Sequence, residues 1–327
     1  MDDDFGVLIV GYRRLDNILN LLEVVIFSGV KQIFIALDRI DDPSGLSEQI
    51  QFLNTIFSLQ EEKQVVINVR HQKENLGAAV SVLTSIDWIC ENCRHFVVLE
   101  DDLVIDDKFL NFAEKSLRYF EGNERVLLVS GNNYFGGQLN SIGFTRLPLT
   151  WGWATSRSKW QKARPHILNT KSDFVKSWHP SSNIILKQFL LAGKRRSIDG
   201  FIDAWDLPLA SYMYENNLLC VLPGNNLVSN IGYDKFALHT KEKNFFHDFP
   251  ISSEQADFEF PNTVVPSRSV ETIIAKDIYQ VKVFNIFSAL LQKTLDFIRK
   301  GNPKFEKSLP NRLNDYEKKI EAHRNSL

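Results

Sequence analysis

Residues 96–104 read FVVLEDDLV, an apolar run that leads directly into three acids. The run is typical of a buried strand. Three adjacent carboxylates at the end of such a strand repel one another, so the folded state favours a cation beside them. Oxygen ligands suit a hard ion such as Mg²⁺ or Mn²⁺, which needs only one or two carboxylates when phosphate oxygens and waters complete its shell. We therefore expect a metal site at residues 100–102. The alternative is a solvated acidic turn, which the flanking apolar residues disfavour.

Short β-branched runs alternate with helical patterns over about the first 135 residues. Strands are predicted at 7–10, 33–37, 65–69, 96–99 and 126–130, with helices at 15–27, 46–59, 78–90 and 108–120. Nearly continuous apolar strands between helices indicate a parallel sheet covered on both faces. The pattern predicts a doubly wound, Rossmann-like α/β domain, whose ligands bind outside the carboxyl ends of the strands.

Polar residues follow the other strands of this predicted sheet. Arg13 comes after the first strand, where a guanidinium can meet a phosphate. Asp38 ends the second strand and is placed to accept hydrogen bonds from a base or a ribose. The third strand leads to ENLGAA, residues 74–79, a helix entry that can lie against an anion. Each signal is weak alone, and their convergence on one sheet edge is the stronger observation. The sequence holds no GxxxxGK[ST] and no GxGxxG pattern.

Composition excludes several classes of protein. A net charge of −2 gives no global positive field, so we expect no nucleic-acid partner. Three cysteines are too few for a disulfide framework. Cys90 and Cys93 resemble half a zinc site or a redox motif, but no matching second pair follows, and two thiols near a helix end is the simpler interpretation. No basic leader or bilayer-length apolar run is visible, so a cytoplasmic setting is expected.

The rest of the chain divides into two parts. Residues 136–265 are rich in Trp, Asn, Gly and Pro, with one clear helix at 207–215 and one strand at 218–222. We interpret them as the second half of a catalytic unit that spans 1–265. Residues 266–327 form a predicted helical, basic tail: from Lys276 onward there are 11 Lys or Arg and 6 Asp or Glu. Its apolar stripe at 277–300 either packs on the catalytic unit or lies peripherally on an anionic membrane surface.

Four ordered blocks resemble N-acetylglucosaminyltransferase I and its bacterial relatives, which are inverting GT-A glycosyltransferases that use UDP-sugars and Mn²⁺. The blocks cover roughly residues 5–242 and comprise the EDD triplet, Asn75-Leu76-Gly77, the run LTWGWA at 149–154 with Trp160, and Trp205-Asp206 with CVLP at 220–223 and NLVSNIG at 226–232. The resemblance implies a GT-A-like nucleotide-sugar-binding half over 1–135 and an acceptor half over 136–265. It also implies transfer of a sugar, with inversion, to a glycan or lipid-linked hydroxyl.

The same resemblance implies a role for each matched residue. Asp102 ligates the metal, Asp101 touches the ribose and Glu100 lies near the donor sugar, while Arg13, Asp38 and Asn75 flank the nucleotide. Asp206 matches the acid beside the catalytic base, although Leu207 stands where the eukaryotic motif has a second Asp. Asp206 therefore acts as the base or simply caps a helix, and Asp203 is the reserve candidate.

Several alternatives stay open at this stage. Trp151, Trp153 and Trp160 either stack on a sugar or fill the core. The polar segment 230–240 is either a lid over the donor or an ordinary surface loop. A sugar-1-phosphate nucleotidylyltransferase also binds a nucleotide and a metal on an α/β sheet, but residues 11–14, GYRR, are a poor version of its Gly-rich, basic loop. A non-catalytic carbohydrate-binding protein has no need of three acids.

Overall fold

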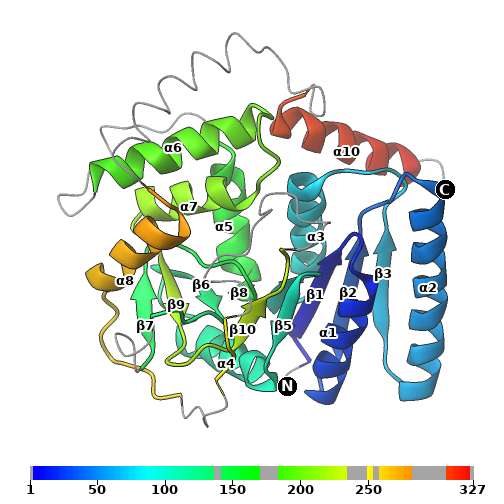
Figure 1. Ribbon diagram of the computed structural model, residues 1–327, viewed down its shortest axis with the longest axis horizontal. Coiled ribbons are helices and arrows are strands. Elements are labelled where there is room, and N and C mark those ends of the chain that lie inside the picture. Colours follow the sequence, from blue (N-terminus) through cyan, green and yellow to red (C-terminus); the bar gives the residue numbers. More distant parts are fainter. Residues whose placement is uncertain are drawn as a thin grey trace.

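An eight-stranded sheet runs through the centre of the molecule (Figure 1). The computed structural model describes residues 3–135, 141–169, 183–233, 249–252, 258–281 and 307–324. The strands follow the order β3-β2-β1-β4-β8-β6-β9-β7. Their bounds are β1 Phe5–Gly11, β2 Gln32–Leu37, β3 Ile67–His71, β4 His95–Glu100, β6 Val126–Ser130, β7 Gly143–Thr145, β8 Trp153–Ser156 and β9 Leu219–Leu222. A second, two-stranded sheet pairs β5, Leu103–Ile105, with β10, Val228–Asn230.

The parallel half of the sheet confirms the sequence pattern, and the other half corrects it. Strands β3, β2, β1 and β4 are parallel neighbours. Strand β6, predicted to close this parallel series, is not adjacent to β4. Strand β8 lies between them and is antiparallel to both. The sequence pattern did not reveal β8, because its four residues carry no long apolar run and its position depends on pairing with two distant strands.

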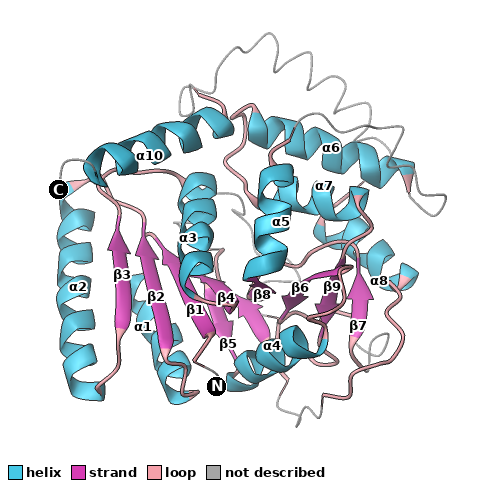
Figure 2. Cartoon of the chain, turned by 180° about the vertical axis from the view of Figure 1, so that it is seen from behind, coloured by secondary structure: helices cyan, strands magenta, loops and turns pink. Residues whose placement is uncertain are grey.

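Helices cover both faces of the sheet, as Figure 2 shows from behind. Helices α1 (Leu15–Phe27), α2 (Pro43–Lys63) and α4 (Asp107–Tyr119) pack on one face, against Val7, Ile9 and their neighbours. Helices α3 (Ala78–Asn92), α5 (Arg157–Ile167), α6 (Ile184–Ile198) and α7 (Asp206–Glu215) pack on the other, against Leu8 and Val10. Because successive side chains of a strand point to opposite faces, each central strand contributes to two cores. The α/β prediction with flanking helices is therefore confirmed.

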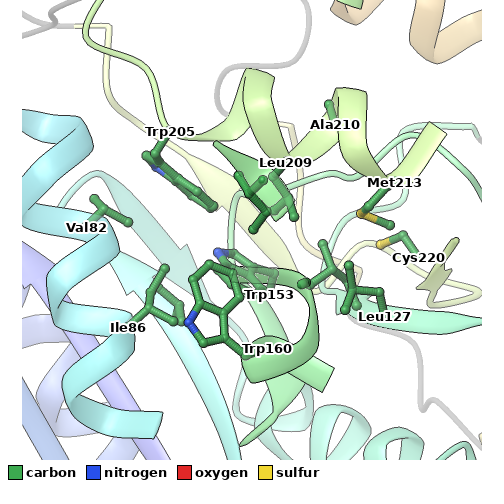
Figure 3. Packing of buried hydrophobic residues seen from close by; sticks show 14 of the residues in the cluster. Val82, Ile86, Leu127, Trp153, Trp160, Trp205, Leu209, Ala210, Met213 and Cys220 are labelled. Atoms are coloured by element: carbon green, nitrogen blue, oxygen red, sulfur yellow. The ribbon is translucent and has the colours of Figure 1, made fainter. Parts of the chain in front are cut away.

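Three tryptophans lie together in the core beneath α7 (Figure 3). Trp153 and Trp160 are fully buried, with ring centroids 6.0 Å apart. Trp205 stacks on Trp153 at 5.5 Å and an interplanar angle of 27°. The core interpretation therefore holds for Trp153 and Trp160, while Trp151 is only partly buried. The cysteine pair is also part of the core, since Cys90 and Cys93 are buried free thiols.

The described parts of the predicted tail pack on the rest of the molecule. Helix α8 (Arg268–Ile273) and the π-helical turn η2 (Ile274–Ile278) bury Val270 and Ile274 in the core. Helix α10 (Leu309–Arg324) buries Leu309 and Leu313 in the same core. The boundary at 265/266 stays a prediction. Because these side chains are internal, removal of the whole tail would expose apolar core.

The prediction of one continuous helix over 277–300 was wrong near its start. Helical structure ends at Ile278, and Gln280 has a φ of 51°. Residues 282–300, which carry most of the predicted membrane-binding stripe, lie outside the described residues, so that contact stays a prediction. Among the helices that the structure describes, none is both long and apolar enough to cross a bilayer.

A buried ion pair attaches α8 to the sheet. Glu271 accepts hydrogen bonds from Arg146 Nε at 2.8 Å and Nη2 at 2.6 Å, and its Oε1 also accepts from the Arg146 backbone N–H at 2.9 Å. Both side chains are less than one-tenth exposed. A charge at this depth is tolerated because it is paired and hydrogen-bonded.

We expect Glu271→Gln to lower the free energy of unfolding by about 3–5 kcal/mol, because it leaves the Arg146 guanidinium buried without its countercharge. Urea unfolding at neutral pH measures this loss. The matched control is Glu124→Gln, which breaks an ion pair whose two side chains are 68% and 72% exposed and should leave the midpoint unchanged. Equal midpoints for the two variants would show that the buried pair does not hold the tail.

Candidate functional site

The acidic turn lies at the carboxyl end of β4, in the middle of the sheet. Glu100 is the last residue of β4, and Asp101 and Asp102 form the turn into β5. Strand β10 pairs with β5, and the Ile231 N–H then donates to the Asp102 carbonyl at 2.8 Å. A Cβ atom at Gly232 would lie 2.3 Å from Asp102 Oδ2, so only glycine lets the backbone pass this carboxylate. The start of the 230–240 segment therefore lies directly on the acidic turn; residues 234–240 are outside the described residues.

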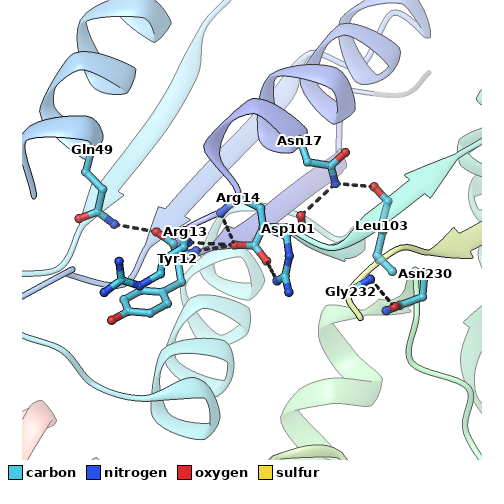
Figure 4. A network of polar contacts seen from close by, with 9 residues as sticks. All are labelled: Tyr12, Arg13, Arg14, Asn17, Gln49, Asp101, Leu103, Asn230 and Gly232. Atoms are coloured by element: carbon cyan, nitrogen blue, oxygen red, sulfur yellow. Dashed lines mark hydrogen bonds and ion pairs between the residues drawn. The ribbon is translucent and has the colours of Figure 1, made fainter. Parts of the chain in front are cut away.

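Asp101 joins the turn to the end of β1 (Figure 4). Its Oδ2 accepts from the backbone N–H groups of Tyr12 at 2.8 Å, Arg13 at 3.3 Å and Arg14 at 3.3 Å, and its Oδ1 accepts from Arg14 Nη1 at 3.1 Å. Asn17 Nδ2 donates to the carbonyls of Asp101 and Leu103. These contacts use the Asp101 carboxylate within the protein. A contact between Asp101 and a ribose stays a prediction.

Glu100 and Asp102 are electrostatically strained. Burial, followed by the neighbouring Asp101 charge, raises the pKa of Asp102 to about 6, against the opposing effects of Arg14 and an Asn230 hydrogen bond. Burial and the charges of Asp102, Asp206 and Asp101 raise the pKa of Glu100 well above its usual value. Carboxylates that resist ionisation in this way are stabilised by a proton or by a cation. The donor set is all oxygen, which fits Mg²⁺ or Mn²⁺.

The charge of Asp206 reaches the acidic turn from the start of α7. Asp206 is the first residue of α7, as predicted, and its charge acts on Glu100. The stacked Trp205 fixes where α7 begins, because its ring is held against Trp153 in the core. The structure thus brings Asp206 within reach of the charge of Glu100, although β4 and α7 are about 100 residues apart in the sequence.

Asp38 follows the end of β2, and Asp203 lies in the segment between α6 and α7; both bind backbone amides. The Asp38 carboxylate accepts from the N–H groups of Arg39 at 3.0 Å, Leu76 at 2.8 Å and Gly77 at 2.9 Å. Asp203 accepts from Ala78 at 2.7 Å and Ala79 at 3.4 Å. The N-terminus of α3, predicted to lie against an anion, therefore faces two carboxylates of the protein itself. This gives Asp203 a structural role and leaves Asp206 the stronger candidate for a base.

Arg13 and Asn75 are near the surface of the same edge. Arg13 Nη2 donates to Asp42 at 2.6 Å, and its guanidinium lies over the Tyr12 ring at 5.0 Å from the centroid. Asn75 Nδ2 donates to the Arg39 carbonyl at 2.8 Å. Their contact with a nucleotide stays a prediction.

Sequence reasoning missed Gln49, a fully buried residue of α2 that contacts the carboxyl ends of β1, β2 and β3. Its Nε2 donates to the carbonyls of Tyr12 at 3.0 Å and Asp38 at 2.7 Å, and its Oε1 accepts from the Ile40 N–H at 3.1 Å. His71 Nε2 lies 3.1 Å from the same Oε1. Burial, then the charge of Arg39, lowers the pKa of His71, which favours the neutral ring. No local signal distinguishes Gln49 from any other polar residue on a helix.

Within the described residues, no three Asp, Glu, His or Cys side chains converge closely enough to hold a metal by themselves. A metal at Asp102 would therefore share its shell with ligands from outside the protein, as Mg²⁺ commonly does on phosphates.

Comparisons with known proteins give only distant likenesses. No family model matches the chain, and no curated protein matches it either. Among solved structures, HddC of Yersinia pseudotuberculosis with GMP-PN is 13% identical, with 47% of this chain and 77% of HddC covered at a TM-score of 0.29. TarS 1–349 of S. aureus is 13% identical, with 49% of each chain covered at 0.35. A Bacillus anthracis protein described as a glucose-1-phosphate thymidylyltransferase, in complex with sucrose, is 13% identical, with 54% of this chain and 80% of that one covered at 0.32.

Likenesses of this size carry no argument about activity. They also leave the resemblance to N-acetylglucosaminyltransferase I unconfirmed, so it stays a prediction.

The buried Asp38 makes the free energy of unfolding depend on pH. Burial raises the pKa of Asp38 to about 6, against its hydrogen bonds from Leu76, Gly77 and Arg39. The native state then binds more protons than the unfolded chain between about pH 4 and 6, so the contribution of Asp38 to stability is present at pH 4 and lost as pH rises through 6.

We expect the free energy of unfolding of wild type, relative to that of Asp38→Asn, to fall by roughly 3 kcal/mol as pH rises from 4 to 7. Asparagine stays neutral over this range, and about two pKa units correspond to that energy. Urea unfolding across this range measures it. Asp41→Asn, which removes a carboxylate whose side chain is 72% exposed, is the control. A difference that is constant with pH would show that Asp38 titrates normally.

Proposed function

We propose that the chain is a metal-dependent glycosyltransferase that moves a sugar from a nucleotide sugar, with UDP as the expected nucleotide, to an acceptor hydroxyl with inversion. The observation that carries the proposal is that Glu100 and Asp102 flank the turn at the carboxyl end of β4, and that the charge of Asp206 acts on Glu100 from the start of α7. Ligands of open α/β sheets bind at this edge. Mutually repelling carboxylates of this kind are stabilised by a cation.

Each residue has a role in this proposal. Asp102 would hold Mn²⁺ or Mg²⁺, with the donor diphosphate and waters as the remaining ligands. The metal supplies charge neutralisation for the departing nucleoside diphosphate. Glu100, on which the charges of Asp102 and Asp206 both act, would face the donor sugar. Asp206 would accept the proton of the attacking hydroxyl, on the face of the sugar opposite the leaving group.

The alternative is a sugar-1-phosphate nucleotidylyltransferase, which the similar structures do not separate from a glycosyltransferase. That reaction is served by a glycine-rich loop with basic residues after the first strand. Here the two arginines after β1 are engaged with the protein, since Arg13 pairs with Asp42 and Arg14 with Asp101. A binding protein without catalysis would gain nothing from the strained carboxylates. The acceptor, whether a glycan or a lipid-linked saccharide, and a peripheral membrane contact through 277–300 stay predictions of the sequence.

We expect Asp102→Asn to abolish Mn²⁺-dependent hydrolysis of a UDP-sugar and to weaken UDP binding in the presence of Mn²⁺, because an amide is a poor ligand for a hard divalent ion. A panel of UDP-sugars, assayed by release of UDP and by calorimetry, measures both. Asp107→Asn removes an exposed carboxylate five residues along the chain and should behave as wild type. Full activity of Asp102→Asn, or of wild type in excess chelator, would overturn the metal site.

For Asp206→Asn we predict that kcat falls by roughly 10²–10⁴, the usual contribution of a general base, while UDP affinity changes little. Asparagine keeps the shape of aspartate, and α7 loses no cap, because Trp205 rather than Asp206 is the N-cap residue of this helix. Steady-state transfer or hydrolysis assays give kcat, with Glu215→Gln at the far end of the same helix as control. A loss of only a few fold would remove Asp206 from the role of base.

A further inference from the structure

The C-terminal helix α10 lies across the helical face of the molecule that also holds α3 and α6 (Figures 1 and 2). Leu309 and Leu313 anchor it in the core shared with α3. Its polar side then meets the loop between β3 and α3, which supplies Asn75, and the segment before α7, which supplies Asp203. The helix therefore touches both sides of the candidate site without contributing any of the acids at its centre.

Arg312 makes these contacts with one guanidinium group. Its Nη1 donates to Asp203 Oδ1 at 2.9 Å, and its Nη2 donates to the Leu76 carbonyl. The Arg312 and Asp203 side chains are 14% and 9% exposed, so the pair is largely shielded from water. Asp203 in turn accepts from the Ala78 N–H. A planar guanidinium is suited to bridging two acceptors at a fixed angle, which a lysine cannot reproduce.

Gly77 shows how closely the pair packs on the loop. Its φ is 75°, and a Cβ atom there would lie 2.6 Å from Asp203 Oδ2 and 2.7 Å from Arg312 Nη2. The Gly77 N–H donates to Asp38. The loop is therefore held between Asp38 on one side and the Arg312–Asp203 pair on the other.

We propose that Arg312 is a positioning residue, which fixes the loop of residues 75–78 against the segment 203–206 and so sets the spacing between the nucleotide side of the site and the start of α7. The inference deepens the proposed function and rests on it for the nucleotide. Its physical basis is that Arg312 adds a second link between the two segments, from Asp203 to the Leu76 carbonyl, beside the direct hydrogen bond from the Ala78 N–H to Asp203. Arg312 also neutralises Asp203, whose charge opposes ionisation of the nearby Asp38.

The test uses the full-length chain and three variants. Arg312→Met removes the charge and keeps the length of the side chain. The double variant Arg312→Met/Asp203→Asn also removes the orphaned carboxylate, while the asparagine oxygen can still accept from Ala78. Lys318→Met, which removes one positive charge from an exposed position of the same helix, is the matched control. UDP affinity with Mn²⁺, the thermal midpoint and hydrogen exchange of the amides of residues 76–79 are measured for each.

We expect UDP to bind about tenfold more weakly to Arg312→Met and to the double variant, although the double variant recovers most of the wild-type thermal midpoint. The amides of residues 76–79 should exchange at least about tenfold faster in both, and at the wild-type rate in Lys318→Met. If affinity recovers together with the midpoint in the double variant, Arg312 serves stability only and the proposal is overturned.

The two proposals fail in different ways. Wild-type protein that binds no UDP with Mn²⁺ would contradict the proposed function. Hydrogen exchange needs no nucleotide, so unchanged protection of residues 76–79 in the double variant would overturn the positioning role of Arg312 whatever the ligand is.

Discussion

The carboxylate of Asp101 accepts hydrogen bonds from three successive backbone N–H groups, those of Tyr12, Arg13 and Arg14, and pairs with the Arg14 guanidinium. This interaction joins the ends of β1 and β4 and holds the acidic turn against the body of the protein. This interaction also fixes the two acids on either side of Asp101. Glu100 and Asp102 are fixed close together in partly buried positions, where both resist ionisation. The requirement for a cation or a proton at this edge follows from that constraint.

Much of the first half of the fold is readable from the sequence. The strands β1 to β4 and the helices α1 to α4 follow from apolar runs of the right length, because strands buried on both faces need nearly continuous hydrophobic residues. The second half is less regular. Strand β8 has four residues, and α5 contains Pro165, so neither shows a strong periodic signal. Their positions are decided by tertiary pairing, which a single sequence does not display.

The site divides in the same way. The acid triplet and Asp206 stand out because a strand or a helix brings them to the sheet edge. The sequence does not show which of these similar carboxylates binds backbone amides and which faces a ligand. Asp101 and Asp203 bind backbone amides more than 80 residues away, and Asp38 binds amides 38 and 39 residues away. Gln49 and Arg312 act through contacts of the same kind. Whether an aspartate organises the protein or faces a ligand is therefore decided by partners that lie far along the chain.

Anomalous diffraction at the manganese edge, from crystals soaked with Mn²⁺ and UDP, would locate the metal directly. We expect one strong peak within coordination distance of an Asp102 carboxylate oxygen, with the UDP diphosphate as a further ligand and Glu100 and Asp206 beside it. A peak elsewhere, or UDP bound away from the carboxyl end of β4, would contradict this expectation.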